Sequence, residues 1–202
     1  MTIDPILLAR ANDAFDRIRA LDEKAAANAR AFRALLEDLN GRTGTKKVYD
    51  PHKTAIEMVR AGILRGAVGT LMTCLDGPDK RDNRASIGQI LTLLEEPGVF
   101  AVWQPTDPGA LQKVRYAYEA ALKTDAHLKC KALRNNDVSH LLHGTLAPTV
   151  EYQDIFDLHD ATEPMVIELC RFVGIAPHCV DKRAHFEQHA KLFWDTYFGA
   201  LP

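Results

Sequence analysis

The sequence predicts an all-α protein, folded as an antiparallel helical bundle. Apolar residues recur at helical spacing through most of the 202 residues, as on the buried face of a helix. Residues typical of helix starts and ends divide that pattern into separate helices. The one strand-like run, "VFAVW" at 99–103, cannot form a sheet alone. With 47% hydrophobic residues the chain can bury a core, and we expect one domain spanning 1–202.

Each predicted helix has its own start signal. Asp-Pro at 4–5 and at 50–51 places an aspartate at the N-cap and a proline at the first helical position. Ser86 caps a short helix that Pro-Gly at 97–98 ends, and Thr-Asp-Pro at 106–108 begins a third long helix. The predicted helices are 5–41, as one helix or two, 51–77, 87–96, 108 toward 131–144, 150–174 with a bend at Pro164, and 181–198.

Composition limits the class of protein. No run approaches the roughly 18 apolar residues of a membrane span, and the N-terminus lacks a signal-peptide pattern, so a cytoplasmic location is expected. The formal net charge of −2 argues against a protein that coats nucleic acid nonspecifically. Four widely separated cysteines are expected to be reduced and to fill the core: Cys74, Cys130, Cys170 and Cys179.

Charged side chains are distributed unevenly. Cations outnumber anions between 111 and 134, and four residues there share one stripe of a continuous helix: Lys123, His127, Lys131 and Arg134. The stripe is either a solvated face or a basic surface that leads into the segment after it. The stretch 151–168 is acidic and contains no Lys or Arg, which indicates either a solvated face or a docking surface for a basic partner.

The segment "KALRNNDVSHLLHG" at 131–144 holds the densest cluster of reactive side chains. Arg134 and His140 are separated by five residues, and the polar Asn135 follows the arginine directly. Two other Arg/His pairs have similar spacing. One is interrupted by a glycine and a proline, and the other has alanine after its arginine. The surrounding residues therefore favour Arg134 and His140.

This pair resembles the Arg-x(4–6)-His signature of the HEPN superfamily, whose helical domains are commonly ribonucleases. Over about 60–198 the chain is similar to the bacterial abortive-infection branch: a long helix ends in a Leu-Asp turn, a Ser-led short helix follows, and the motif closes the next long helix. The resemblance implies a four-to-five-helix core with extra helices, a homodimer with motifs facing across its interface, and RNA cleavage without metal or other cofactor. It also implies a toxin or phage-defence role, and several HEPN toxins are paired with a nucleotidyltransferase-type antitoxin.

The chemistry assigns a role to each residue of the motif. RNA is cut without metal when its own 2′-OH attacks the adjacent phosphate, which needs a base and cationic stabilisation. His140 is the candidate base, Arg134 stabilises the phosphate, and Asn135 orients the phosphate or the histidine. The candidate substrate-binding residues are Asn136, His143, Lys131, His127 and Lys123.

Several alternatives stay open. On a straight helix Arg134 and His140 lie about 120° from coincidence, so they meet only if the helix bends or a second subunit completes the site. His143 is a second candidate base. A DinB-like metal-binding bundle is another possibility, because His185 and His189 at i, i+4 face one side, with a third ligand from His52, His143 or His159. A catalytically inactive HEPN interaction module is a further alternative function.

Overall fold

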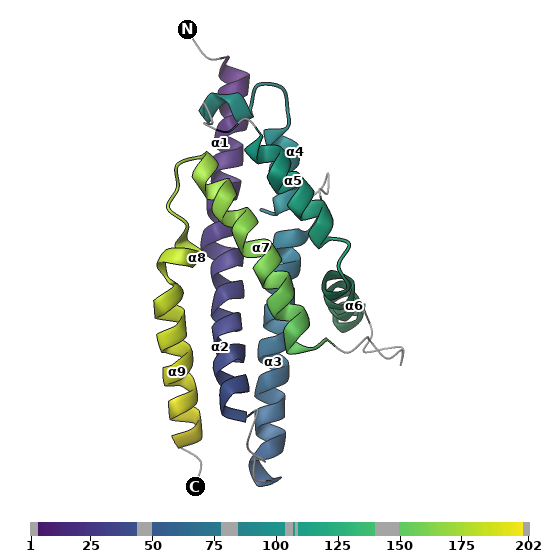
Figure 1. Cartoon of the computed structure of the whole chain (residues 1–202), viewed down its shortest axis with the longest axis vertical. Coiled ribbons are helices and arrows are strands. Elements are labelled where there is room, and N and C mark those ends of the chain that lie inside the picture. The colour runs from purple at the N-terminus through teal and green to yellow at the C-terminus, as the bar shows by residue number, and fades with distance from the viewer. Residues whose placement is uncertain are drawn as a thin grey trace.

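The computed structural model describes residues 4–43, 50–77, 85–103, 107, 109–139 and 150–199, and within these it describes no side chains for 43, 50–55 and 136–139. The described residues form an all-helical bundle (Figure 1), as the sequence predicted. The elements are, in order, α1 Pro5–Ala20, η1 Leu21–Ala26, α2 Ala27–Thr43, α3 Asp50–Leu75, α4 Ile87–Leu94, η2 Phe100–Trp103, α5 Ala110–Ala121, α6 Asp125–Ser139, α7 Tyr152–Phe172, α8 His178–Asp181 and α9 Arg183–Gly199.

The first long helix begins where its capping residues predict. The Asp4 carboxylate accepts a hydrogen bond from the Ile6 amide at 2.9 Å, and Pro5 is the first residue of α1. α1, η1 and α2 then follow one another without interruption from Pro5 to Thr43. The middle element η1 is a π-helix, a wider turn that places an extra residue in the helix. The 5–41 region is thus one continuous helical rod.

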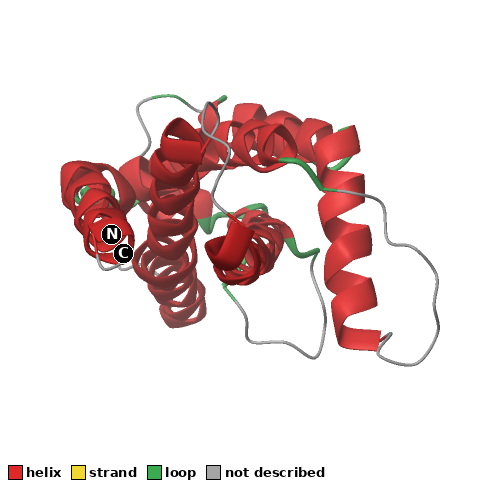
Figure 2. Cartoon of the chain, turned by 90° about the horizontal axis from the view of Figure 1, so that it is seen from below, coloured by secondary structure: helices red, strands yellow, loops and turns green. Residues whose placement is uncertain are grey.

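Around this rod the helices alternate in direction. α2 and α7 run antiparallel, since Arg30 on α2 lies 3.8 Å from Glu163 while Arg33 pairs with Asp160. α9 returns antiparallel to α7 and therefore runs parallel to α2, to which the Trp194 indole binds by donating to the Leu35 carbonyl at 2.9 Å (Figure 1). α6 lies at one edge of the bundle and crosses its long axis, so Figure 1 views it nearly end-on and Figure 2 from the side.

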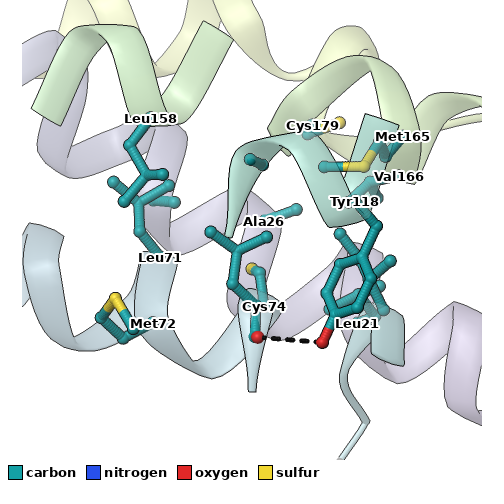
Figure 3. Packing of buried hydrophobic residues seen from close by; sticks show 14 of the residues in the cluster. Leu21, Ala26, Leu71, Met72, Cys74, Tyr118, Leu158, Met165, Val166 and Cys179 are labelled. Atoms are coloured by element: carbon teal, nitrogen blue, oxygen red, sulfur yellow. Dashed lines mark hydrogen bonds between the residues drawn. The ribbon is translucent and has the colours of Figure 1, made fainter. Parts of the chain in front are cut away.

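One continuous hydrophobic core joins these elements. Figure 3 shows side chains meeting there from η1, α3, α5, α7 and α8, namely Leu21, Ala26, Leu71, Met72, Cys74, Tyr118, Leu158, Met165, Val166 and Cys179. All four cysteines are free and buried, as expected. Burial raises the pKa of the Cys74, Cys130 and Cys170 thiols to about 12, so these thiols are unreactive core side chains.

The strand-like run at 99–103 forms no sheet in the described chain, as predicted, and its residues 100–103 form the 3₁₀ helix η2. One local prediction is wrong. The third long helix is interrupted. α5 ends at Ala121, and the Thr124 hydroxyl caps a new helix by accepting from the His127 amide at 3.2 Å. By contrast, the predicted Ser86 cap of α4 is confirmed.

One described segment, Ile56–Leu75 of α3, has the length and mean hydropathy, 1.3, of a membrane span, although the sequence was expected to contain no such run. In the bundle this helix contacts α2, α6 and α7 and contributes Leu71 and Met72 to the core. These contacts account for the buried part of its apolar surface, which is 39% of the apolar window.

Candidate functional site

The predicted motif lies at the far end of α6. Arg134 and Asn135 belong to its last turns, and the backbone of Asn136 continues the helix. His140 and His143 lie outside the described residues, as does the side chain of Asn136. The described part of the site is therefore its cationic half, which α6 holds against the end of α3.

Arg134 reaches from α6 to the residue that follows α3. Its Nη1 donates to Asp76 Oδ1 at 2.7 Å. The Arg134 and Asp76 side chains are 28% and 21% exposed, so the pair is sheltered yet reachable from solvent. A charge-assisted bond of this length fixes the guanidinium more firmly than a surface ion pair would.

The end of α3 that carries Asp76 is itself fixed by neighbouring helices. The buried Tyr118 hydroxyl of α5 lies 3.3 Å from both the Leu75 and the Asp76 carbonyl oxygens and donates there. Figure 3 shows the Tyr118 hydroxyl making a hydrogen bond at this point of the core. Gly88 of α4 packs against the same point, because a Cβ at Gly88 would lie 2.9 Å from the Asp76 carbonyl oxygen and 2.4 Å from the Tyr118 hydroxyl oxygen. α4 and α5, together with α3 itself, thus position Asp76, the residue that holds Arg134.

His127, a predicted substrate-binding residue, is buried rather than part of an exposed stripe. It is 4% exposed, and its Nδ1 has no hydrogen-bond partner in the described chain. Burial lowers the pKa of His127, and the positive charges of Lys131 and Arg134 lower it further, against a hydrogen bond to the Leu122 backbone and the Asp76 charge. The imidazole is therefore neutral, and it does not present a cation to a substrate.

Two other predicted binding residues, Lys131 and Lys123, and the predicted catalytic residue Asn135 lie on the surface. Lys131 and Asn135 are exposed on α6, and Lys123 is exposed in the turn that separates α5 from α6. Because α5 and α6 are separate helices, Lys123 does not belong to one stripe with Lys131 and Arg134, as a continuous helix would have required. What remains of the stripe is an exposed lysine next to the anchored Arg134.

The carboxylates of the acidic helix α7 form ion pairs with Lys and Arg side chains of this chain. Carboxylates of α7 pair with residues of α2, α6 and α9, in addition to one pair inside α7: Lys129–Asp154 at 2.8 Å, Arg33–Asp160, Arg183–Glu163 at 3.1 Å and Arg171–Glu168 at 3.0 Å. These pairs explain the absence of Lys and Arg from 151–168, since the compensating charges come from elsewhere in the sequence. Four of the six carboxylates in 151–168 are thus already paired within the chain.

Among the described residues, the metal-binding alternative gains no third ligand. The rings of His185 and His189 lie 4.1 Å apart and both residues are exposed, as their spacing predicts. In the part of the chain that the structure describes, no group of three His, Cys, Asp or Glu side chains is arranged to hold a metal ion. His159 is buried and bonded to Arg33, while the side chain of His52 and all of His143 lie outside the described residues.

A separate groove of about 510 Å³ lies between α1, η1 and α3, with Asp13, Asp16, Arg17 and Lys24 along it. None of the predicted site residues lines this groove.

The sequence did not identify Asp76, which binds Arg134, or Tyr118 and Gly88, which pack against the backbone of Asp76. The available signal was the Leu-Asp end of a predicted helix, which placed a carboxylate at 76 without showing what it would contact. Comparison of the whole chain with protein-family models, with curated proteins and with solved structures gave no match.

Proposed function

We propose that this protein is a metal-independent RNA endonuclease of the HEPN type, acting as a toxin or phage-defence effector. The observation that carries the proposal is Arg134 itself. This arginine of the Arg-x(5)-His motif is partly accessible to solvent and follows the exposed Lys131 on α6. Its guanidinium is held by Asp76 at 2.7 Å. An anchored guanidinium with an accessible face suits the stabilisation of a phosphate.

In the proposed reaction the substrate supplies its own nucleophile. A base removes the proton of the RNA 2′-OH, the oxygen attacks the adjacent phosphorus, and the bond from phosphorus to the 5′-oxygen breaks. The leaving oxygen takes up a proton, and the products are a 2′,3′-cyclic phosphate and a 5′-hydroxyl. His140 transfers the protons, Arg134 stabilises the negative charge on phosphorus, and Asn135 orients the phosphate or the histidine.

The remaining parts of the proposal concern assembly. A homodimer would bring two motifs together and would supply the contact that one straight helix does not allow between Arg134 and His140. A nucleotidyltransferase-type antitoxin is the partner expected for a toxin of this type. Two alternatives are tested beside this proposal. One is the inactive interaction module, although several carboxylates of its acidic α7 are already paired within the chain. The other is the DinB-like metal bundle, whose histidine pair on α9 has no third ligand among the described residues.

The test is cleavage of single-stranded RNA in excess chelator, with analysis of the product ends. Wild-type protein should leave 2′,3′-cyclic phosphates and should spare DNA, which lacks the attacking hydroxyl. Arg134→Ala and His140→Ala should each lower the rate by about 10²- to 10⁴-fold. Arg115→Ala is the matched control. Arg115 lies on the neighbouring α5 and also pairs with a carboxylate, that of Glu95, at 2.7 Å.

Two further variants separate the alternatives. Cleavage that survives His140→Ala but disappears in His143→Ala would move the base to His143. Cleavage that requires an added metal ion, or that His189→Ala abolishes, would replace the proposal with the metal-binding bundle.

A further inference from the structure

We propose that Asp76 is a positioning residue, whose carboxylate fixes the Arg134 guanidinium in the orientation that phosphate stabilisation requires. This inference rests on the function proposed above and extends it to a residue outside the Arg/His motif. Asp76 lies 58 positions before Arg134 in the sequence and joins it only through the fold.

The first support is that Asp76 cannot easily move. It follows Leu75, the last residue of α3, and the Tyr118 hydroxyl binds the carbonyl groups of both residues at 3.3 Å. Tyr118 is only 3% exposed, so this bond is shielded from water. A carboxylate whose backbone is held by such a bond transmits that rigidity to its partner.

The second support is the close packing of α4 against the same point. Gly88 is buried, and its α-carbon approaches so closely that an added Cβ would meet the Asp76 carbonyl oxygen at 2.9 Å. Real Cβ atoms essentially never approach within 3.0 Å of another heavy atom. The α3 end is thus enclosed by α4, α5 and α6 together.

The third support is the geometry of the arginine. A guanidinium is a planar fork with five N–H donors. When Nη1 is bound to Asp76 Oδ1, the plane of the fork is restrained by a short charge-assisted bond. Orientation of this kind matters most in the transition state, where misplacement by about 1 Å can cost about 10²-fold in rate.

The negative charge of Asp76 distinguishes a positioning role from a role in RNA binding. A carboxylate beside a phosphate-binding arginine repels the substrate, so its removal should not weaken RNA binding. Asp76 is therefore expected to raise the turnover rate while contributing nothing favourable to affinity. A residue needed only for folding would instead lower stability and would change both quantities through the loss of folded protein.

The experiment compares steady-state cleavage of single-stranded RNA by wild-type protein, Asp76→Asn and Asp76→Glu, with the melting temperature of each. Asp76→Asn should lower kcat by about 10- to 100-fold with KM unchanged or lower. Asp76→Glu, which keeps the charge on a longer side chain, should recover part of kcat. Glu95→Gln is the matched control, since it removes one carboxylate from the Arg115 pair, and its kcat should equal the wild-type value.

The outcomes distinguish the two proposals. Wild-type protein that does not cut RNA refutes the function and, with it, the role of Asp76. If wild-type protein cuts RNA and Asp76→Asn keeps or raises kcat, only the positioning role is refuted. Should Asp76→Asn not fold, Asp76→Ala is measured in its place, and an unchanged kcat in that variant would refute the positioning role as well. Side-chain ¹⁵N spectra provide a readout without turnover: rotation of the Arg134 guanidinium should be restrained in wild-type protein and free in Asp76→Asn.

Discussion

Arg33 of α2 donates a hydrogen bond to Nδ1 of His159 on α7, across 3.0 Å. An arginine can only donate, so the accepting nitrogen of His159 carries no proton. Burial lowers the pKa of His159 to about 3, and the charges of Arg33, Arg30 and Arg183 act in the same direction, opposed by Asp160. The acidic helix therefore docks on the bundle with a neutral histidine at the centre of its ion pairs.

This arrangement predicts acid sensitivity. The pKa of His159 is lower in the folded protein, about 3, than the ordinary value of 6.5 expected after unfolding. The stabilising contribution is therefore complete above pH 6.5 and is lost as the pH falls toward 3, by about 1.4 kcal/mol per pH unit. Urea unfolding at several pH values should show a shallower loss of stability in His159→Gln than in wild-type protein.

His185→Gln is the control for this experiment, because His185 is exposed. It should keep the wild-type dependence on pH. An equal slope in His159→Gln and wild-type protein would show that His159 is not held neutral by the fold.

Asp22 on the π-helical turn is expected to be a major stabilising residue. It is 1% exposed and accepts hydrogen bonds from the amides of His178, at 2.6 Å, and Cys179, at 3.2 Å, at the start of α8. Asp22→Ala leaves both amides without this acceptor and should lower the free energy of unfolding by about 2 to 4 kcal/mol. Glu23→Ala removes the adjacent, exposed carboxylate, whose surface ion pair with Arg19 contributes little, and it should lower the stability far less. Urea titration of both variants measures the difference, and equal losses would contradict a special role for Asp22.

Gly88→Ala should destabilise the protein by about 1 to 3 kcal/mol, since the new methyl group overpacks the end of α3. The closest atom is the Tyr118 hydroxyl oxygen, at 2.4 Å, so adding Tyr118→Phe should recover part of the loss. Gly69→Ala is the comparison within α3: a Cβ there meets nothing within 4 Å, and alanine should stabilise the helix by up to about 1 kcal/mol. Thermal unfolding of the single and double variants tests the coupling, and strict additivity would rule out the proposed clash.

Short-range signals predicted the helix starts, and long-range pairing was not predictable from them. Asp4 and Ser86 cap their own helices within three residues, so their roles can be read locally. Thr124 also caps locally, but the stretch 121–126 contains no glycine or proline, so the break between α5 and α6 was not predicted.

The candidate site also contains features that the local sequence predicts and features that depend on long-range packing. Arg134 and Lys131 were found because a motif and a charge cluster mark them in the sequence. The burial of His127 and the pairing of Arg134 with Asp76 depend on how α6 packs on α3, which helical spacing along one segment does not encode. Likewise, some of the cations that pair with α7 lie far away in the sequence, such as Arg33, which precedes Asp160 by 127 positions. Others come from the neighbouring α6 and α9.

The last prediction concerns which cations contact RNA. Binding of a fluorescent 2′-O-methyl RNA, which lacks the attacking hydroxyl, is measured by anisotropy over a range of salt concentrations. Lys131→Ala and Lys123→Ala should each reduce the slope of log affinity against log salt by about 0.7, the value for one single-strand phosphate contact. His127→Asn should leave the slope unchanged, because the buried imidazole carries no charge to neutralise a phosphate. Lys113→Ala is the matched surface control, since Lys113 is exposed on α5 and pairs with Asp107. A slope that falls in His127→Asn as much as in the lysine variants would mean that RNA binding opens the packing between α6 and α3 and exposes the histidine.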